Sequence, residues 1–371
     1  MPVVAAAETE KGVMFSTRCC KLLWVSFALL PGLSLAQAAA VPEAVGTYIK
    51  AKAIFTAAPS YPQADVINGR EGWVMLSFVV SKEGRVNDVM IEDSSGNEDL
   101  ERAAVRSVHN WRYEPATLNG KPMEQSMTST RIIFQIDHSE KGASRGFVKK
   151  FKQIQAAISS GDLKKADEML TSMQFSGRMN LYEDAWFWWS KYSYLHATGN
   201  AEPEELIDAL RKATGYEVEY LPPAVFVAAS EQLYALQVRA LDFSGAMHTF
   251  ERLSGSKSAP RADSYKKVLA AMKPLYDKIK ELAEGSQVLK LNGQVGAHSY
   301  WVHKILRRSF SLGDVQGQLE SLDIRCERGY KKYIKIAAGS VWNVPTSWGD
   351  CGVYVKGSKG AAFAFYAYPS K

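Results

Sequence analysis

Three kinds of hydrophobic pattern follow one another along the chain. Between residues 59 and 138, apolar runs rich in β-branched and aromatic residues alternate with turn sequences. Residues 144–285 hold alanine-rich amphipathic stretches with few strand signals, and residues 286–371 return to short runs separated by Gly and Pro. The pattern predicts a multidomain α+β protein with a mixed first domain, an all-α middle and a β-rich end.

The first domain, residues 59–138, is predicted to have the order strand, strand, helix, strand. Trp73–Val80 and a second run over 86–91 form a hairpin with Gly84 in its turn. Asn97 is suited to cap the helix that follows. The apolar residues at helical spacing are Leu100, Ala103, Ala104, Val108 and Trp111, and Pro115 ends the helix. The last strand is Arg131–Ile136, which completes a ββαβ unit.

Aromatic, Gly, Ser and Pro residues of this domain occur in a specific order over nearly 80 positions. They are Tyr61-Pro62, Ala64, Gly72, Gly84, Ser94-Ser95-Gly96, Trp111-Arg112-Tyr113, Pro115-Ala116, Asn119-Gly120 and Phe134. In order and spacing they resemble the C-terminal domain of the TonB family of energy transducers. The resemblance implies a periplasmic module that pairs with an extended segment of a TonB-dependent outer-membrane receptor.

The resemblance also implies where that segment binds. It places the partner-binding residues before the first strand and on the last one: Ser60, Tyr61, Pro62, Gln63, Arg131, Ile132, Ile133, Phe134, Gln135 and Ile136. A three-stranded sheet has open edges, and an open edge accepts an incoming strand through main-chain hydrogen bonds. The alternative is that Phe134 belongs to the core and that Tyr61 and Pro62 pin the entering chain.

Residues 1–38 have the pattern of a secretory signal peptide. Arg18 and Lys21 precede the apolar segment Leu22–Leu35, and a small-x-small site, Ala36-Gln37-Ala38, follows it. We therefore predict cleavage after Ala38 and a periplasmic protein; the alternative is an uncleaved inner-membrane anchor that faces the periplasm. A linker over residues 39–58 follows. Its 20 or so residues lack a proline-rich run and reach about 60 Å when extended, which departs from the long proline-rich spacer of a complete TonB transducer.

Charge and cysteine content depend on that cleavage. Residues 1–38 contain three basic and two acidic side chains, so 42 and 37 remain, a net charge of +5. With no basic run longer than three residues, this weak excess predicts no nucleic-acid partner. Two cysteines remain, Cys326 and Cys351, and in an oxidising compartment we predict that they form a disulfide. Two buried thiols are the alternative.

The helical middle, residues 144–285, shows a repeat of 40 residues. The equivalent positions are Asp162, Glu202 and Asp242; Ala166, Leu206 and Ala246; and Leu170, Leu210 and Phe250. Such a spacing predicts a tetratricopeptide-like array of helical hairpins, which would offer a surface to a second protein partner. An irregular bundle is the alternative. The aromatic run Trp186–Trp189 is read as a peptide-binding stripe or, more commonly for such a cluster, as packing between helices.

The β-rich end, residues 286–371, is predicted to be a small sandwich-like domain stabilised by the disulfide. Its candidate strands are Val288–Leu291, Trp301–Phe310, Leu319–Cys326, Tyr333–Ile336, Val341–Val344, Cys351–Val355 and Ala362–Tyr366. Leu322, Ile324 and Cys326 share one face of their strand, as do Cys351, Val353 and Val355, so the bridge would join two inward faces.

No motif for catalysis, for a metal or for a cofactor is present. The six histidines lack the i, i+4 spacing of a helical zinc pair, and no nucleophile elbow, phosphate loop or dinucleotide fingerprint occurs. The sequence therefore predicts a non-enzymatic periplasmic adaptor that acts in TonB-dependent transport. The alternatives are a membrane-anchored energy transducer and an envelope assembly or structural protein.

Overall fold

The computed structural model describes residues 3–8, 47–136, 142–176, 178–216, 220–296, 298–337 and 339–369. The apolar segment 22–35, the site after Ala38, and Cys19 and Cys20 lie outside the described residues, so the signal peptide stays a prediction. Within the described ranges no helix is both long and apolar enough to cross a membrane.

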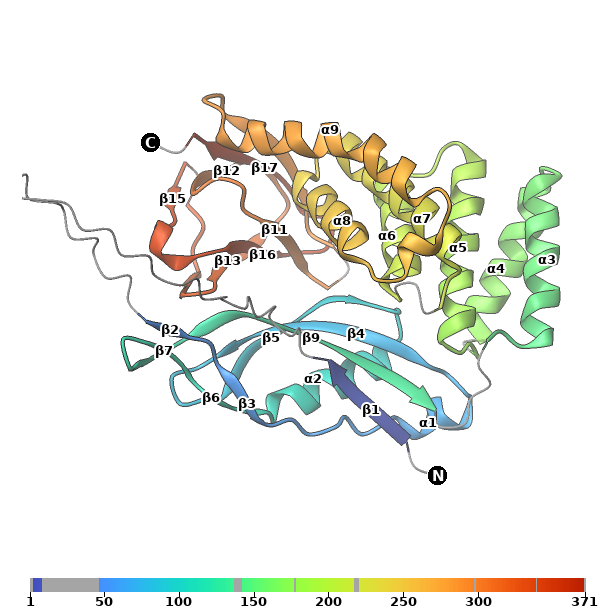
Figure 1. Cartoon of the computed structure of the whole chain (residues 1–371), viewed down its shortest axis with the longest axis horizontal. Coiled ribbons are helices and arrows are strands. Elements are labelled where there is room, and N and C mark those ends of the chain that lie inside the picture. The colour runs from blue at the N-terminus through green and yellow to red at the C-terminus, as the bar shows by residue number, and fades with distance from the viewer. Residues whose placement is uncertain are drawn as a thin grey trace, which may run out of the picture.

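The N-terminal module, residues 47–136, is a twisted sheet with one long helix on its lower face (Figure 1). Its main elements are β4 (Gly72–Val80), β5 (Val86–Ser94), α2 (Glu98–His109) and β9 (Gln125–Ile136). The predicted order is confirmed, with a last strand that begins earlier than predicted. The short elements are β2 (Tyr48–Ile49), β3 (Lys52–Phe55), α1 (Gln63–Ile67), β6 (Arg112–Glu114), β7 (Ala116–Leu118) and β8 (Lys121–Met123).

Local chemistry explains the turns that connect these elements. Asn97 caps α2 as predicted, because its side chain accepts hydrogen bonds from the backbone N–H groups of Asp99 and Leu100. Gly84, in the β4–β5 hairpin, has φ +72°, and a Cβ there would lie 1.9 Å from the carbonyl oxygen of Tyr113. Only glycine fits this turn. The helix ends at His109, earlier than the predicted stop at Pro115, so Trp111 follows it and is buried in the core.

The sheet has the strand order β1-β9-β4-β5 and all pairs are antiparallel. Its first strand is β1 (Val3–Glu8). Eight of the nine residues of β4 are buried, which shows that both faces of the sheet are covered. On the α2 face the core consists of Val74, Leu76, Phe78, Leu100, Ala103, Ala104, Val108, Trp111, Ile132 and Phe134, with further residues of β4, β5 and β6.

The helical module, residues 142–284, runs from the right-hand end of the molecule toward the centre (Figure 1). Its helices are α3 (Arg145–Ser159), α4 (Leu163–Ser176), α5 (Leu181–Thr198), α6 (Pro203–Gly215), α7 (Pro223–Arg239), α8 (Phe243–Gly255) and α9 (Tyr265–Glu284). The repeat positions Asp162, Glu202 and Asp242 directly precede α4, α6 and α8. Each helix packs against its neighbour in sequence. The tetratricopeptide-like assignment itself stays a prediction.

The aromatic run of α5 packs between helices rather than forming an exposed stripe. Phe187 and Trp188 are buried, and the ring centroids of Trp186 and Phe151 lie 5.1 Å apart. This fits the packing interpretation of the run.

The C-terminal module, residues 289–369, consists of two four-stranded sheets, with orders β10-β17-β12-β15 and β11-β16-β13-β14. The strands are β10 (Leu289–Gln294), β11 (Tyr300–Lys304), β12 (Ser309–Gln316), β13 (Leu319–Cys326), β14 (Gly329–Tyr333), β15 (Val341–Asn343), β16 (Cys351–Gly357) and β17 (Ala362–Tyr368). Both sheets contribute to one core, which includes Phe310 and Phe365 from the first and Ile324 and Val353 from the second.

Two strands of this module differ from the sequence prediction. The run Trp301–Phe310 forms β11 and β12 rather than one strand, because a turn around the buried Arg307 separates them. The predicted strand Tyr333–Ile336 is wrong: β14 ends at Tyr333, and Ile334 is 78% exposed. The predicted disulfide between Cys326 and Cys351 is confirmed.

Candidate functional site: the outer edge of β9

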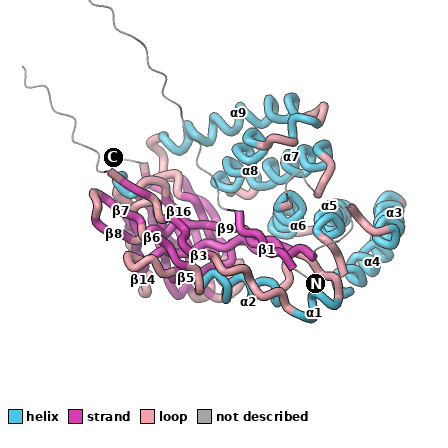
Figure 2. Tube along the Cα trace, turned by 60° about the horizontal axis from the view of Figure 1, so that its bottom comes forward, coloured by secondary structure: helices cyan, strands magenta, loops and turns pink. Residues whose placement is uncertain are grey.

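The candidate site is the edge of β9 that faces away from β4. Over Arg131–Ile136 this edge pairs antiparallel with β1, in a register that places Val3 opposite Ile136 and Glu8 opposite Arg131. Figure 2 shows β1 lying along β9 on the outside of the sheet. The sequence predicted an open edge here; the structure instead has six residues of the same chain on it. The pairing shows that the edge has room for an extended backbone.

The direction of the main-chain groups on this edge follows from one contact. The N–H of Ile136 donates to Glu71 Oε1 at 2.8 Å, and Glu71 directly precedes β4. Ile136 N–H therefore points to the β4 side. Because successive N–H groups of a strand point to alternate sides, those of Arg131, Ile133 and Gln135 point outward, where an incoming strand would bind.

On the α2 side, the predicted site residues form part of the core. Ile132 and Phe134 are buried, and the ring of Tyr61 meets that of Phe134 edge-on at 5.3 Å. The Tyr61 hydroxyl donates to the carbonyl of Arg70 at 2.6 Å. Burial raises the pKa of Tyr61, so the hydroxyl stays protonated and keeps this bond. Tyr61 thus pins the entering chain against β9.

The other predicted residues of the entering segment surround Tyr61 in sequence. Pro62 precedes α1, Gln63 begins it, and both Ser60 and Gln63 are exposed. Of the four residues predicted before the first strand, Tyr61 is the one that contacts β9, through the ring of Phe134.

On the opposite face, β9 packs against the helical module. The Arg131 guanidinium lies 5.4 Å from the ring centroid of Trp73, and Trp73 meets Tyr216 edge-on at 5.8 Å. Ile133 packs against the same cluster, which also contains Leu181. An incoming strand would therefore have the N-terminal core on one face and the end of the helical module near the other.

Glu71 fixes one end of β9 to the helical module. Its side chain is 6% exposed. Oε1 accepts the hydrogen bond from Ile136, Oε2 accepts from the N–H of Leu181 at 3.1 Å, and the backbone N–H of Glu71 donates to Met179 at 3.1 Å. Leu181 is the first residue of α5, where a carboxylate is favourable because the first N–H groups of a helix have no partner within it.

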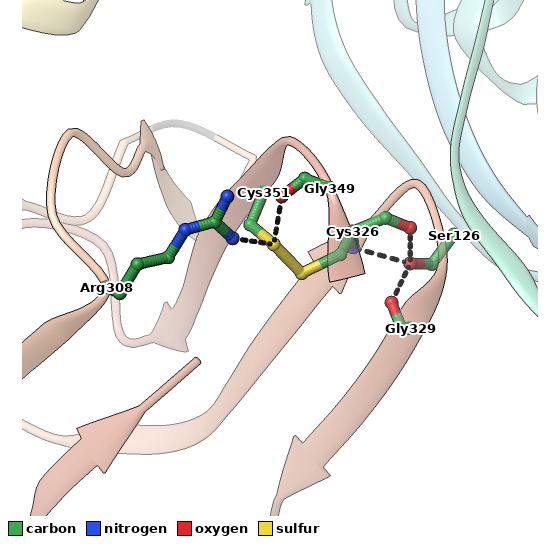
Figure 3. Close-up of a disulfide and its surroundings, with 6 residues drawn as sticks. All are labelled: Ser126, Arg308, Cys326, Gly329, Gly349 and Cys351. Atoms are coloured by element: carbon green, nitrogen blue, oxygen red, sulfur yellow. Dashed lines mark hydrogen bonds between the residues drawn. A yellow bond between two sulfur atoms is a disulfide. The ribbon is translucent and has the colours of Figure 1, made fainter. Parts of the chain in front are cut away.

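Ser126 fixes the other end of β9 to the C-terminal module (Figure 3). Its hydroxyl is fully buried and accepts from the N–H of Cys326 at 2.8 Å. The carbonyl oxygens of Cys326 and Gly329 lie 3.0 Å and 2.9 Å away, so either can take its proton. Since Cys326 is bonded to Cys351, β9 is tied to the disulfide that joins β13 to β16.

We expect Ser126→Ala to lower the free energy of unfolding by about 1–2 kcal/mol, because it leaves a buried N–H without an acceptor. Urea denaturation measures the effect. The matched control is Ser129→Ala, an exposed serine on the same strand, which should change the stability by less than about 0.5 kcal/mol. Equal midpoints for both variants would contradict a structural role for the Ser126 contact.

A second polar interface joins β5 to the C-terminal module. Arg325 is 1% exposed; it donates to the carbonyl of Asp88 at 3.1 Å, and Tyr330 donates to the Asp88 carboxylate at 3.0 Å. Burial alone would raise the pKa of Asp88, but the bonds from Lys332 and Tyr330 outweigh it and hold the pKa below its usual value. Tyr354 also donates to Glu92 at 2.9 Å. The C-terminal module is thus fixed to the face of the sheet opposite α2.

Sequence reasoning did not identify Glu71, Ser126 or Arg325. The signal for Arg325 was present, because Asp323 and Arg325 alternate with the inward residues of β13 and so share one face. Glu71 and Ser126 carry no comparable local signal. Among the described residues, no group of three or more His, Cys, Asp or Glu side chains could hold a metal ion.

Sequence comparisons with known proteins match part of this chain. Residues 57–136 match the family described as Gram-negative bacterial TonB protein C-terminal. Protein TonB of Xanthomonas campestris pv. campestris is 40% identical over 63 residues, which are 17% of this chain and 28% of that protein. Protein tonB2 of Pseudomonas aeruginosa is 35% identical over 80 residues, 22% of this chain and 29% of that protein.

The match to these relatives is confined to one part of each protein, since the chain spans under a third of their length. A solution NMR structure of the Pseudomonas aeruginosa TonB CTD is 22% identical, with a TM-score of 0.20; the match covers 24% of this chain and 91% of that one. The family model and the sequence relatives agree that this part of the chain is similar to the C-terminal region of TonB proteins, over residues 57–136 in the family model.

Proposed function

We propose that this chain is a non-enzymatic periplasmic adaptor that acts in TonB-dependent transport across the outer membrane. Its outer β9 edge binds an extended segment of a TonB-dependent outer-membrane receptor by strand addition. The observation that carries the proposal is the pairing of β1 with Arg131–Ile136, in a domain that matches the TonB C-terminal family. It supports the proposal because it places an extended backbone on this edge.

The two ends of β9 give further support. Glu71 holds Ile136 against the helical module, and Ser126 holds the start of β9 against the C-terminal module. An edge that is fixed before binding loses little conformational entropy when a partner strand adds to it. The helical and C-terminal modules therefore serve the binding edge as a frame.

The test is a proline at Gln135, an exposed residue whose N–H points outward. Gln135→Pro removes that donor and puts a ring where the partner strand would lie. We expect it to weaken binding of synthetic receptor N-terminal peptides by about tenfold or more, measured by calorimetry. Gln135→Ala keeps the N–H and should bind within about threefold of the wild type.

Because β1 pairs with the same residues and lies within the predicted signal peptide, each variant is also prepared without residues 1–38. If neither wild-type form binds any receptor peptide, the adaptor proposal fails. If Gln135→Pro binds as tightly as Gln135→Ala, the peptide binds elsewhere and strand addition at this edge is wrong.

A further inference from the structure

The helix α3 lies at one extreme of the molecule. Figures 1 and 2 both place it at the end of the helical module, on the side away from the C-terminal module. Among the described elements it packs mainly against α4 and α5, which leaves its other long side without a described helix packed on it. Its sequence contains four basic side chains, Arg145, Lys149, Lys150 and Lys152, and no acidic one.

Three of these cations form a stripe on the outer side of α3. At 100° per residue, Arg145, Lys149 and Lys152 fall within about 60° of one another. All three are exposed, and so is Val148 at the margin of the stripe. The opposite side carries the buried residues Phe147, Ile154 and Ala157. The helix therefore presents a basic face outward while its apolar face packs on the module.

Within the part of the chain that the structure describes, no ion pair balances the charge of this face. Neither Arg145, Lys149 nor Lys152 forms an ion pair with another described residue. Other exposed helices behave differently. In α9, Lys273 pairs with Asp277 at 2.7 Å and Lys278 with Glu281 at 2.9 Å, and α6 pairs Arg211 with Asp208 at 3.2 Å. The three cations of the α3 face have no such ion pair among the described residues, whereas these cations of α6 and α9 do.

We propose that the basic face of α3, defined as Arg145, Lys149 and Lys152, docks on an anionic phospholipid bilayer. Charge complementarity selects anionic headgroups. The place of α3 favours a bilayer over a folded protein, because a straight helix at the end of the molecule offers a convex line rather than a groove. A flat surface can meet all three cations without touching the other modules. Docking through α3 would keep the β9 edge in one position relative to the membrane surface.

The expected strength follows from the number of cations. A basic residue near an anionic membrane surface contributes roughly a fivefold increase in partitioning. Three such residues together give on the order of 100-fold. Binding of this strength is reversible and depends on salt, because mobile ions screen the surface charge.

The test uses the full chain and sedimentation with vesicles. Vesicles of phosphatidylcholine with about 30 mol% phosphatidylglycerol are compared with pure phosphatidylcholine, at about 50 mM and about 500 mM NaCl. We expect binding to the anionic vesicles at low salt, release at high salt, and on the order of 100-fold weaker binding of the R145E/K149E/K152E variant.

The matched control is K257E/K266E/K267E, which reverses three exposed lysines elsewhere. Both triple variants have 42 basic and 42 acidic side chains, so net charge alone cannot separate them. The control should bind within about threefold of the wild type. If the α3 triple variant fails to fold, Lys152→Gln alone should lower binding about fivefold.

Four results would overturn the proposal. The α3 variant could bind vesicles as the wild type does, or the control could lose binding equally. The wild type could bind poly-glutamate but not anionic vesicles, which would indicate an acidic protein partner. Inorganic phosphate at constant ionic strength could displace the protein from vesicles, which would indicate a site for free phosphate. Each result is independent of receptor-peptide binding at β9.

Discussion

Replacing Arg307 with methionine is expected to lower the free energy of unfolding by about 4 kcal/mol. The side chain is 2% exposed and lies in the turn between β11 and β12. Its guanidinium donates to five carbonyl oxygens, those of Leu282, Ala283, Gly285, Gln287 and Ala367. Methionine fills a similar volume but donates nothing, so each of these five carbonyl groups loses the hydrogen bond from Arg307.

The position of these oxygens explains the size of the effect. Leu282 and Ala283 belong to the last turn of α9, whose carbonyl groups have no partner within the helix, and a cation is favourable there. Ala367 is on β17, so one side chain joins the helical module to the C-terminal sandwich. Arg307→Lys keeps the charge but not the planar set of five donors. Its free energy of unfolding should therefore lie between those of the wild type and Arg307→Met.

Urea denaturation followed by tryptophan fluorescence measures the three stabilities. The control is Lys304→Met, which replaces a charged side chain by an uncharged one. The Lys304 side chain is 53% exposed, and its ammonium group lies 3.8 Å from the Asp350 carboxylate. This control should lower the free energy of unfolding by no more than about 1 kcal/mol. If Arg307→Met unfolds at the same urea concentration as this control, the joint between α9 and the sandwich does not depend on Arg307.

The sequence pattern predicted the elements of the N-terminal module well because their signals are local. Trp73–Val80 is a nearly continuous apolar run, and the structure buries it on both faces as β4. Asn97 caps α2 through the N–H groups of the residues two and three positions after it, and Gly84 adopts the positive φ that the hairpin turn requires. The 40-residue repeat likewise located the starts of α4, α6 and α8.

Predictions failed where distant residues decide the structure. The alternation in β13 indicated an inward face with Leu322 and Ile324, but it did not indicate what covers the opposite face, which carries Asp323 and Arg325. The structure buries that polar face against β5 of the N-terminal module. Period-two alternation identifies the two faces of a strand but not what covers each. The hydrophobic pattern therefore could not predict how the modules pack against one another.

The same limit applies to the candidate site. The family resemblance points to Arg131–Ile136 as the binding strand, through the order and spacing of many residues rather than through any single position, and this assignment stays a prediction. It did not locate the supports of the edge. Glu71 bonds to residues 65 and 110 positions away, and Ser126 to residues 200 and 203 positions away. The contacts to Leu181, Cys326 and Gly329 exist only because this chain has two modules besides this domain.

A buried histidine gives the second large expected effect. His303 lies on β11 between the rings of Trp301 and Phe365, at centroid distances of 5.2 Å from each. Burial lowers the pKa of His303 from 6.5 to about 4. Because the unfolded chain takes up the proton first as the pH falls, the contribution of His303 to stability is complete above pH 6.5 and lost progressively toward pH 4. The loss amounts to about 3 kcal/mol.

Asp184 opposes this trend, so the total pH profile does not isolate His303. Burial raises the pKa of Asp184 from 3.8 to about 7, although Tyr216 donates to it at 2.6 Å. Its folded pKa exceeds the unfolded one. The contribution of Asp184 is therefore complete below pH 3.8 and lost as the pH rises through about 7. A comparison of variants at each pH removes this contribution, since both chains contain Asp184.

We therefore expect the stability difference between the wild type and His303→Phe to change by about 3 kcal/mol in favour of the variant, as the pH falls from about 7 to about 4. Phenylalanine keeps the ring contacts and cannot take up a proton. Trp301→Phe is the control: it loses packing area but no titratable group, so its difference from the wild type should stay constant with pH. If the His303→Phe difference also stays constant, His303 is solvated in the folded state and the packing of β11 on β17 is looser than the structure indicates.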